Sequence, residues 1–129
     1  MIKESKIVID NDKLVRSCLF VNKTILIGSG DCLLLVPADM SSQRHLFKGK
    51  SINCIEQISD TTQVIVGMHL EKHLSILDLK TEQVIKTILI PHDYIRVISI
   101  REVKGTSMLV LQDAYYGLFM IDKDQPTFK

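Results

Sequence analysis

Three stretches of the chain repeat one pattern: an apolar triplet, a short polar turn, an apolar run and then an aspartate. The stretches are residues 25–39, 64–78 and 108–122. In all three, fourteen positions separate the first apolar residue from the aspartate. Because a fixed period in a sequence usually reflects one structural unit used several times, this pattern constrains the fold more than composition does.

Each repeat contains enough apolar stretches for about four short β-strands. A third stretch precedes each pattern, and a fourth follows the first two. These stretches are residues 14–21, 52–58 and 95–103, and residues 44–47 and 84–88. The repeat aspartates lie 39 and 44 residues apart, which is the length of four strands with their turns. The hairpins are predicted to turn near residues 29–31, 70–72 and 114–116.

The apolar runs are continuous rather than alternating, most clearly at residues 33–36, 108–111 and 118–121. A strand with one face in water alternates, whereas a strand buried on both faces is apolar throughout. The turns are too short for the crossover helices of a parallel sheet. We therefore predict an all-β fold of stacked β-propeller blades, with a small β-barrel or sandwich as the alternative. Residues 68–90 also have helical spacing, but their register with the other repeats favours strands.

Residues 74–88 resemble the third and fourth strands of a blade from the Trp-Asp repeat (WD-repeat) family. In that family an apolar strand ends in Trp-Asp, before a polar turn and an outer strand rich in Val and Ile. The Trp-Asp position is held here by Leu77-Asp78, Ala38-Asp39 and Ile121-Asp122. His92 stands near the place of the family's Gly-His pair. The resemblance covers about residues 14–122, as three degenerate blades.

The chain also departs from the family pattern. It has no Trp and no Gly-His pair, and Gly49-Lys50 precedes the middle blade instead. Blades of this kind are similar to the citron-homology propellers as well. The resemblance implies one partial propeller domain, residues 1–129, with blades at about 13–49, 50–91 and 92–129.

The family usually provides non-catalytic protein–protein interaction or scaffolding, and we expect that function here. Three blades are too few for a closed ring, which takes about four to eight. We therefore expect a piece of a longer protein, a short product, or one part of an assembly. The expected partner is a protein of unknown identity, with self-association or completion by other blades. A structural subunit completed by another chain is an alternative.

The charge balance argues against two classes of partner. Sixteen basic residues against fifteen acidic ones leave a net charge of +1, and no three basic residues are consecutive. A nucleic-acid or anionic-membrane surface normally carries a clustered basic excess, so we expect neither partner. Cys18, Cys32 and Cys54 form an odd set within apolar strands, which favours core residues over disulfides. The first residues resemble no signal peptide or membrane anchor, and we expect a soluble, cytoplasmic protein.

We expect no catalytic residue, no cofactor and no metal. His69 and His73 have the spacing of a helical metal pair, but in a hairpin they become solvated turn residues. A metal-dependent binder or enzyme that uses this turn is an alternative function. Gly28-Ser29-Gly30 lacks the helix and the Lys-Ser/Thr of a phosphate loop, so we expect a tight turn. The repeat aspartates fall in different blades, where each is expected to cap a turn.

Three tyrosines are the candidates for contact with a partner. Tyr94, Tyr115 and Tyr116 lie in predicted turns, where an exposed aromatic ring can anchor an interface. The positions expected to serve the repeat's structure are Asp39, Asp78, Asp122, Gly28 and Gly67.

Overall fold

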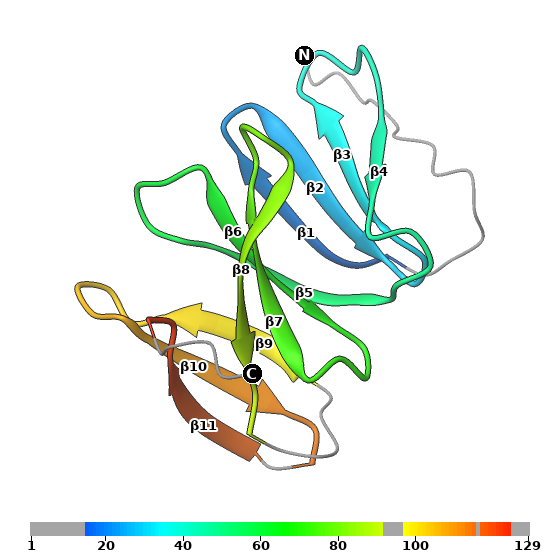
Figure 1. The fold of residues 1–129 in the computed structure, drawn as a ribbon. Helices are drawn as coiled ribbons and strands as arrows, with labels where there is room; N and C mark the ends of the chain where they lie inside the picture. The colour runs from blue at the N-terminus through cyan, green and yellow to red at the C-terminus, as the bar shows by residue number, and fades with distance from the viewer. Residues whose placement is uncertain (1–14, 92–96, 116, 125–129) are drawn as a thin grey trace, which may run out of the picture.

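The computed structural model describes residues 15–91, 97–115 and 117–124, and these residues form three antiparallel sheets with no helix (Figure 1). The first sheet contains β1 (Val15–Val21), β2 (Thr24–Ser29), β3 (Leu33–Pro37) and β4 (Arg44–Leu46). The second contains β5 (Ile52–Gln57), β6 (Gln63–Met68), β7 (His73–Asp78) and β8 (Gln83–Leu89). The third contains β9 (Val97–Glu102), β10 (Met108–Asp113) and β11 (Gly117–Asp122). The predicted all-β fold is confirmed.

The hairpins turn where the repeat predicts them. The turns connect β2 to β3, β6 to β7 and β10 to β11. Residues 68–90 form strands and turns, although their spacing also allowed a helix. In β7 four consecutive residues, 74–77, are buried, which requires cover on both faces of a strand. Tertiary packing, rather than the spacing of the apolar residues, therefore determines that this segment forms strands.

The sheets stack in chain order, and their first strands β1, β5 and β9 adjoin one another (Figure 1). Each gap between two sheets is filled by branched aliphatic side chains. The buried residues between the first and second sheets are Val21, Leu26, Leu33, Leu35, Ile52, Val64, Val66 and Leu77. The second and third sheets bury a larger cluster that includes Ile65, Leu74, Ile76, Ile88, Ile100, Leu109, Leu111 and Ile121. The outward face of the first sheet holds a third, separate cluster of Ile27, Leu34 and Val36.

Backbone pairing identifies the residues that match between sheets. The central hairpins pair Ile27 with Leu34, Val66 with Ser75, and Leu111 with Phe119. These pairs enclose six, eight and seven residues respectively, so the constant interval in the sequence conceals hairpins of different length. As a result Pro37, not Asp39, matches Asp78 and Asp122. Residues of different sheets are said to match when this pairing aligns them.

Two expectations about burial are wrong. Residues 118–121 were predicted to be buried on both faces, yet β11 alternates, with Leu118 and Met120 exposed and Ile121 buried. Residues 108–111 alternate as well, because within the described residues no sheet covers the outward face of the third one. Of the three runs 33–36, 108–111 and 118–121, only residues 33–36 are buried throughout. Cys18 is exposed rather than part of the core, whereas Cys32 and Cys54 are buried.

Candidate interaction surface on the third sheet

β11 is the last strand of its sheet, and half of its backbone groups point outward. The N–H of Lys123 donates to the carbonyl of Ser107 at 2.8 Å, which fixes the hydrogen-bonded positions between β10 and β11. These positions alternate in an antiparallel pair, so the N–H and C=O groups of Leu118, Met120 and Asp122 point away from β10. Within the described part of the chain, β11 pairs with β10 alone. We call these outward groups the open edge.

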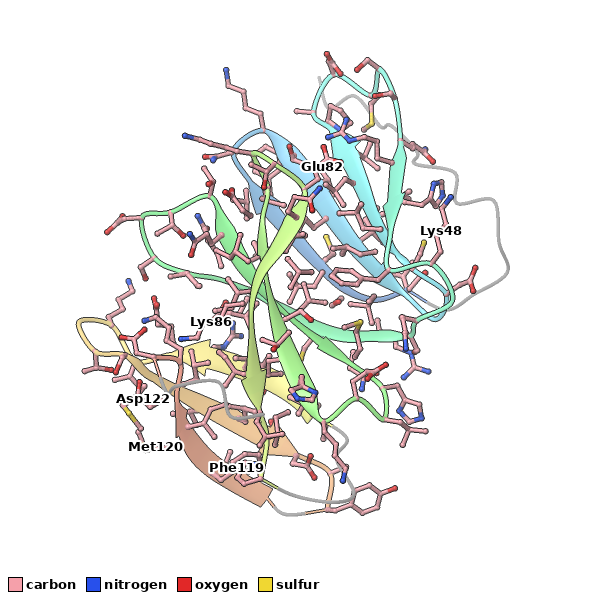
Figure 2. All side chains as sticks on the ribbon, viewed as in Figure 1. Lys48, Glu82, Lys86, Phe119, Met120 and Asp122 are labelled. Atoms are coloured by element: carbon pink, nitrogen blue, oxygen red, sulfur yellow. The ribbon has the colours of Figure 1, made fainter. Side chains whose placement is uncertain are left out.

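Two of the three side chains at the open edge, Leu118 and Met120, are apolar and exposed. Leu118 is 72% exposed and Met120 is 54% exposed, and Figure 2 shows Met120 at the outer border of the molecule. The matching residues of the first two sheets are Leu33, Leu35, Leu74 and Ile76. None of these four is more than 4% exposed, because the next sheet packs against each pair. The same repeat position is therefore core in two sheets and surface in the third.

In each of the first two sheets, a glycine faces the next sheet. A Cβ atom on Gly28 would lie 2.7 Å from Cγ2 of Ile52 in the next sheet. A Cβ atom on Gly67 would lie 3.5 Å from Cδ1 of Ile100 in the third sheet. The third sheet has Gln112 at the matching position, where a sheet packed as closely as the second sheet packs on Gly28 would collide with the Gln112 side chain. We call Val110, Gln112, Leu118 and Met120 the open face.

Charged groups border the open edge near the end of β11. The Nζ of Lys86 on β8 donates to the carbonyl of Lys123 at 2.6 Å, which ties the second sheet to the third (Figure 2). The carboxylate of Asp122 accepts the backbone N–H of Asp124 at 2.9 Å. Hydrogen bonds from Ser107 and Asp124, with the charges of Lys86 and Lys123, lower the pKa of Asp122.

A second set of polar contacts, at Glu102, joins the second sheet to the third. We call it the clamp at Glu102. The Glu102 carboxylate accepts the Ser59 N–H at 3.0 Å and the Ser59 hydroxyl at 2.5 Å, and its other oxygen lies 3.2 Å from Nζ of Lys123. Burial raises the pKa of Glu102, but these hydrogen bonds and the lysine charge outweigh it and lower the pKa overall.

Of the three candidate tyrosines, the structure describes one. Tyr115 is exposed in the turn between β10 and β11, and its N–H donates to Oδ1 of Asp113 at 2.8 Å. Tyr94 and Tyr116 lie outside the described residues. Tyr115 therefore stays a prediction, and it lies at the start of the strand that carries the open edge.

The three repeat aspartates are in separate turns and do not converge. Oδ1 of Asp39, Asp78 and Asp122 accepts the backbone N–H two residues further on, at 2.9, 3.0 and 2.9 Å. Such a bond stabilises the turn that follows a strand. Hydrogen bonds from the Ser41 side chain and backbone lower the pKa of Asp39.

The histidines of the alternative function are not part of a cluster in the described residues. His69 and His73 are exposed at the two ends of the β6–β7 turn. In the part of the chain that the structure describes, no group of three His, Cys, Asp or Glu residues could hold a metal ion. Burial raises the pKa of the Cys54 thiol to about 12, which keeps it protonated and unreactive. No helix among the described residues is long and apolar enough to span a bilayer.

The first strands of the sheets form a shallow polar hollow of about 230 Å³. Its rim includes Arg16, Asn53 and Arg101. Nη1 of Arg16 donates to Oδ1 of Asn53 at 3.4 Å, and Nη1 of Arg101 lies 3.5 Å from Oε1 of Glu56. The charges of this hollow are thus partly satisfied within the chain, and they do not assemble a reaction centre.

Three blades cannot close a ring, so an uncovered last blade was expected from the sequence, but the residues of the open edge and the open face were not identified. Residues 118–121 were interpreted as a strand suited to cover on both faces, because their apolar composition equals that of the earlier repeats.

The comparisons with known proteins concern the fold. No protein family matches the sequence, and no curated protein matches it. The WD40 domain of Pan2 from Neurospora crassa is a structural match with a TM-score of 0.65 and 12% sequence identity. The match covers 89% of this chain and 34% of that domain, so the chain spans about a third of its length. The three stacked sheets therefore have the architecture of part of a β-propeller.

Proposed function

We propose that the chain is a non-catalytic protein–protein interaction module of the WD-repeat-like propeller type, and that it works as part of a larger protein or assembly. The observation that carries the proposal is the third sheet: a propeller-like stack ends in an exposed apolar face with an open edge. Apolar surface of this kind on a folded domain commonly marks a binding site for another protein. A structural subunit completed by another chain is the variant of this function that the same observation favours.

Catalysis has less support. An active site needs a nucleophile or an acid–base pair that converges on one place. In the described residues the aspartates cap separate turns, and the buried Cys54 thiol stays protonated. We therefore propose a function through binding, in the cytoplasm, a location that the odd number of cysteines supports.

Site-specific photo-crosslinking tests this proposal. A photoreactive phenylalanine analogue is placed at Tyr115, and also, as a control, at Lys48, which is exposed in the turn after β4 (Figure 2). In cells that express the chain, we expect a discrete crosslinked protein from Tyr115, which should then bind the purified chain saturably. Crosslinks from neither position, or binding that does not saturate, would contradict an interaction module.

A further inference from the structure

We propose that the open edge of β11 accepts an extended segment of another protein, which pairs antiparallel with β11 and completes the third sheet as its fourth strand. The inference deepens the proposed function and depends on it. In both complete sheets the strand that matches β11 carries such an outer strand: β3 pairs with β4, and β7 pairs with β8, each antiparallel. The backbone groups of Leu118, Met120 and Asp122 offer the same ladder to a partner.

The two outer strands also indicate the chemistry of the segment. On the first sheet, Leu46 lies opposite Leu33 and Arg44 lies opposite Leu35. On the second, the matching pairs are Ile88 with Leu74 and Lys86 with Ile76. Both outer strands thus carry a basic residue, any residue, and then Leu or Ile. A segment with this Lys/Arg-x-Leu/Ile pattern would place its aliphatic side chain opposite Leu118 and its basic side chain opposite Met120.

Charge at the open edge suits a basic residue in that place. The carboxylate of Asp122 is exposed, and Asp122 and Met120 lie on the same face of β11, two residues apart. A cation opposite Met120 is a diagonal neighbour of Asp122, within reach of a long side chain. The lowered pKa of Asp122 keeps this carboxylate charged.

A single strand fits the third sheet better than a further propeller blade. A fourth sheet that packed on the open face as closely as the second sheet packs on Gly28, where an added Cβ atom would lie 2.7 Å from Ile52, would collide with the side chain of Gln112. Gln112 also accepts a hydrogen bond from the Ser99 hydroxyl at 3.3 Å, and a covering sheet would remove both groups from water. A strand at the outer edge contacts Leu118 and Met120 and leaves Gln112 in solvent.

A second copy of this chain does not fit. Head-to-tail docking would set the open face against the outward face of the first sheet, where Ile27, Leu34 and Val36 are already buried. Pairing of two β11 strands would bring no basic side chain to the open edge, because β11 itself carries none.

The probe is a synthetic peptide of residues 82–90, which contains the outer strand of the second sheet with its Lys-Thr-Ile pattern. Amide hydrogen exchange is followed by NMR on the purified chain. We expect the amides of Leu118, Met120 and Asp122 to exchange fast in the free chain and to slow by roughly tenfold or more with bound peptide. The amide of Ile121, which bonds to β10, serves as the internal control and should change little.

Two matched controls separate strand pairing from general stickiness. A peptide with N-methyl groups on alternate backbone amides of the pairing side keeps every side chain and should not bind. Met120→Lys should weaken binding about tenfold or more by like-charge contact with the peptide lysine, and a peptide with Glu in place of that lysine should restore it. Ile85→Lys, at a residue of similar exposure on β8, should leave binding unchanged.

Four results would overturn the inference. Slow exchange of Leu118, Met120 and Asp122 in the free monomer would show that the chain itself covers the open edge. Protection that grows with protein concentration alone would assign the edge to a second copy. Equal binding of the N-methylated peptide would exclude strand pairing. If Met120→Lys keeps the crosslinked partner found through Tyr115, the inference fails while the proposed interaction function stands.

Discussion

The first two sheets and the third sheet are built from the same repeat, yet they differ in what covers them. Leu74 in the second sheet and Leu118 in the third hold matching positions, and their exposed fractions are 1% and 72%. Composition does not cause this difference, because both residues are leucines in the second strand of a central hairpin. The neighbouring sheet causes it. At this position, the neighbouring sheet determines whether a side chain is buried, and the sequence of the strand only provides a side chain that is compatible with burial.

The largest contrast is expected from truncating these two leucines. Leu74→Ala removes buried methyl groups and leaves a cavity between the second and third sheets, so it should lower the free energy of unfolding by about 2–5 kcal/mol. Leu118→Ala loses almost no buried surface, and its effect should stay within about 0.5 kcal/mol. Urea unfolding of both variants measures the difference. Equal losses would mean that Leu118 is covered in solution.

The glycines give the next largest contrast. Gly28→Ala would place a Cβ atom 2.4 Å from Oγ of Ser17 and 2.7 Å from Cγ2 of Ile52, so the strands must shift apart. Such overpacking typically costs about 1–3 kcal/mol. Gln112→Ala, at the matching position of the third sheet, should change the free energy of unfolding by less than about 0.5 kcal/mol. Thermal unfolding distinguishes the two, and a harmless Gly28→Ala would show that the first two sheets are more loosely packed than described.

Local pattern was enough to predict the strands and turns, because each hairpin is encoded by neighbouring residues. Alternate burial on β11 was not predictable in the same way. Residues 118–121 have a composition that suits a covered strand, and Leu118 and Met120 are exposed because no sheet formed by the described residues covers them. That absence is a long-range fact about the stack, so it leaves no mark in a window of a few residues.

The register of the repeat shows a second limit of sequence reasoning. A constant interval suggested that Asp39 matches Asp78, whereas pairing assigns that place to Pro37. In the first repeat the hairpin is shorter, and Asp39 lies two residues beyond Pro37, the residue that matches Asp78, so the interval stays the same. Counting residues along the sequence cannot detect this compensation. The hydrogen bonds that define the register connect different strands and not residues adjacent in sequence. The bond from the Ala38 N–H to the Lys23 carbonyl is an example.

The clamp at Glu102 should make the junction of the second and third sheets sensitive to acid. The pKa of Glu102 lies below its ordinary value of 4.5 in the folded chain, so the folded state binds fewer protons than the unfolded state. Its contribution to stability is therefore complete above about pH 4.5 and is lost as the pH falls through the lower folded pKa. Urea unfolding across this range should show a smaller decline for Glu102→Gln than for the native chain. Parallel declines would assign the acid sensitivity elsewhere.

The smallest effect is expected at the junction of the first and second sheets, where the charged contact lies in solvent. Nε of Arg44 is 2.7 Å from Oε2 of Glu82, and the two side chains are 45% and 27% exposed. Exposed pairs of this kind contribute about 0.2–1 kcal/mol, so Glu82→Gln should lower the free energy of unfolding within that range at low salt. The loss should shrink in about 1 M NaCl, where the Debye length is about 3 Å. A loss above about 2 kcal/mol that ignores salt would instead indicate a desolvated pair. Arg44 holds the basic position of the Lys/Arg-x-Leu/Ile pattern. If its ion pair contributes little free energy, we expect the basic residue of a bound segment to contribute little to affinity as well. That residue would then select the register of the segment, while backbone pairing and the aliphatic side chain supply the affinity.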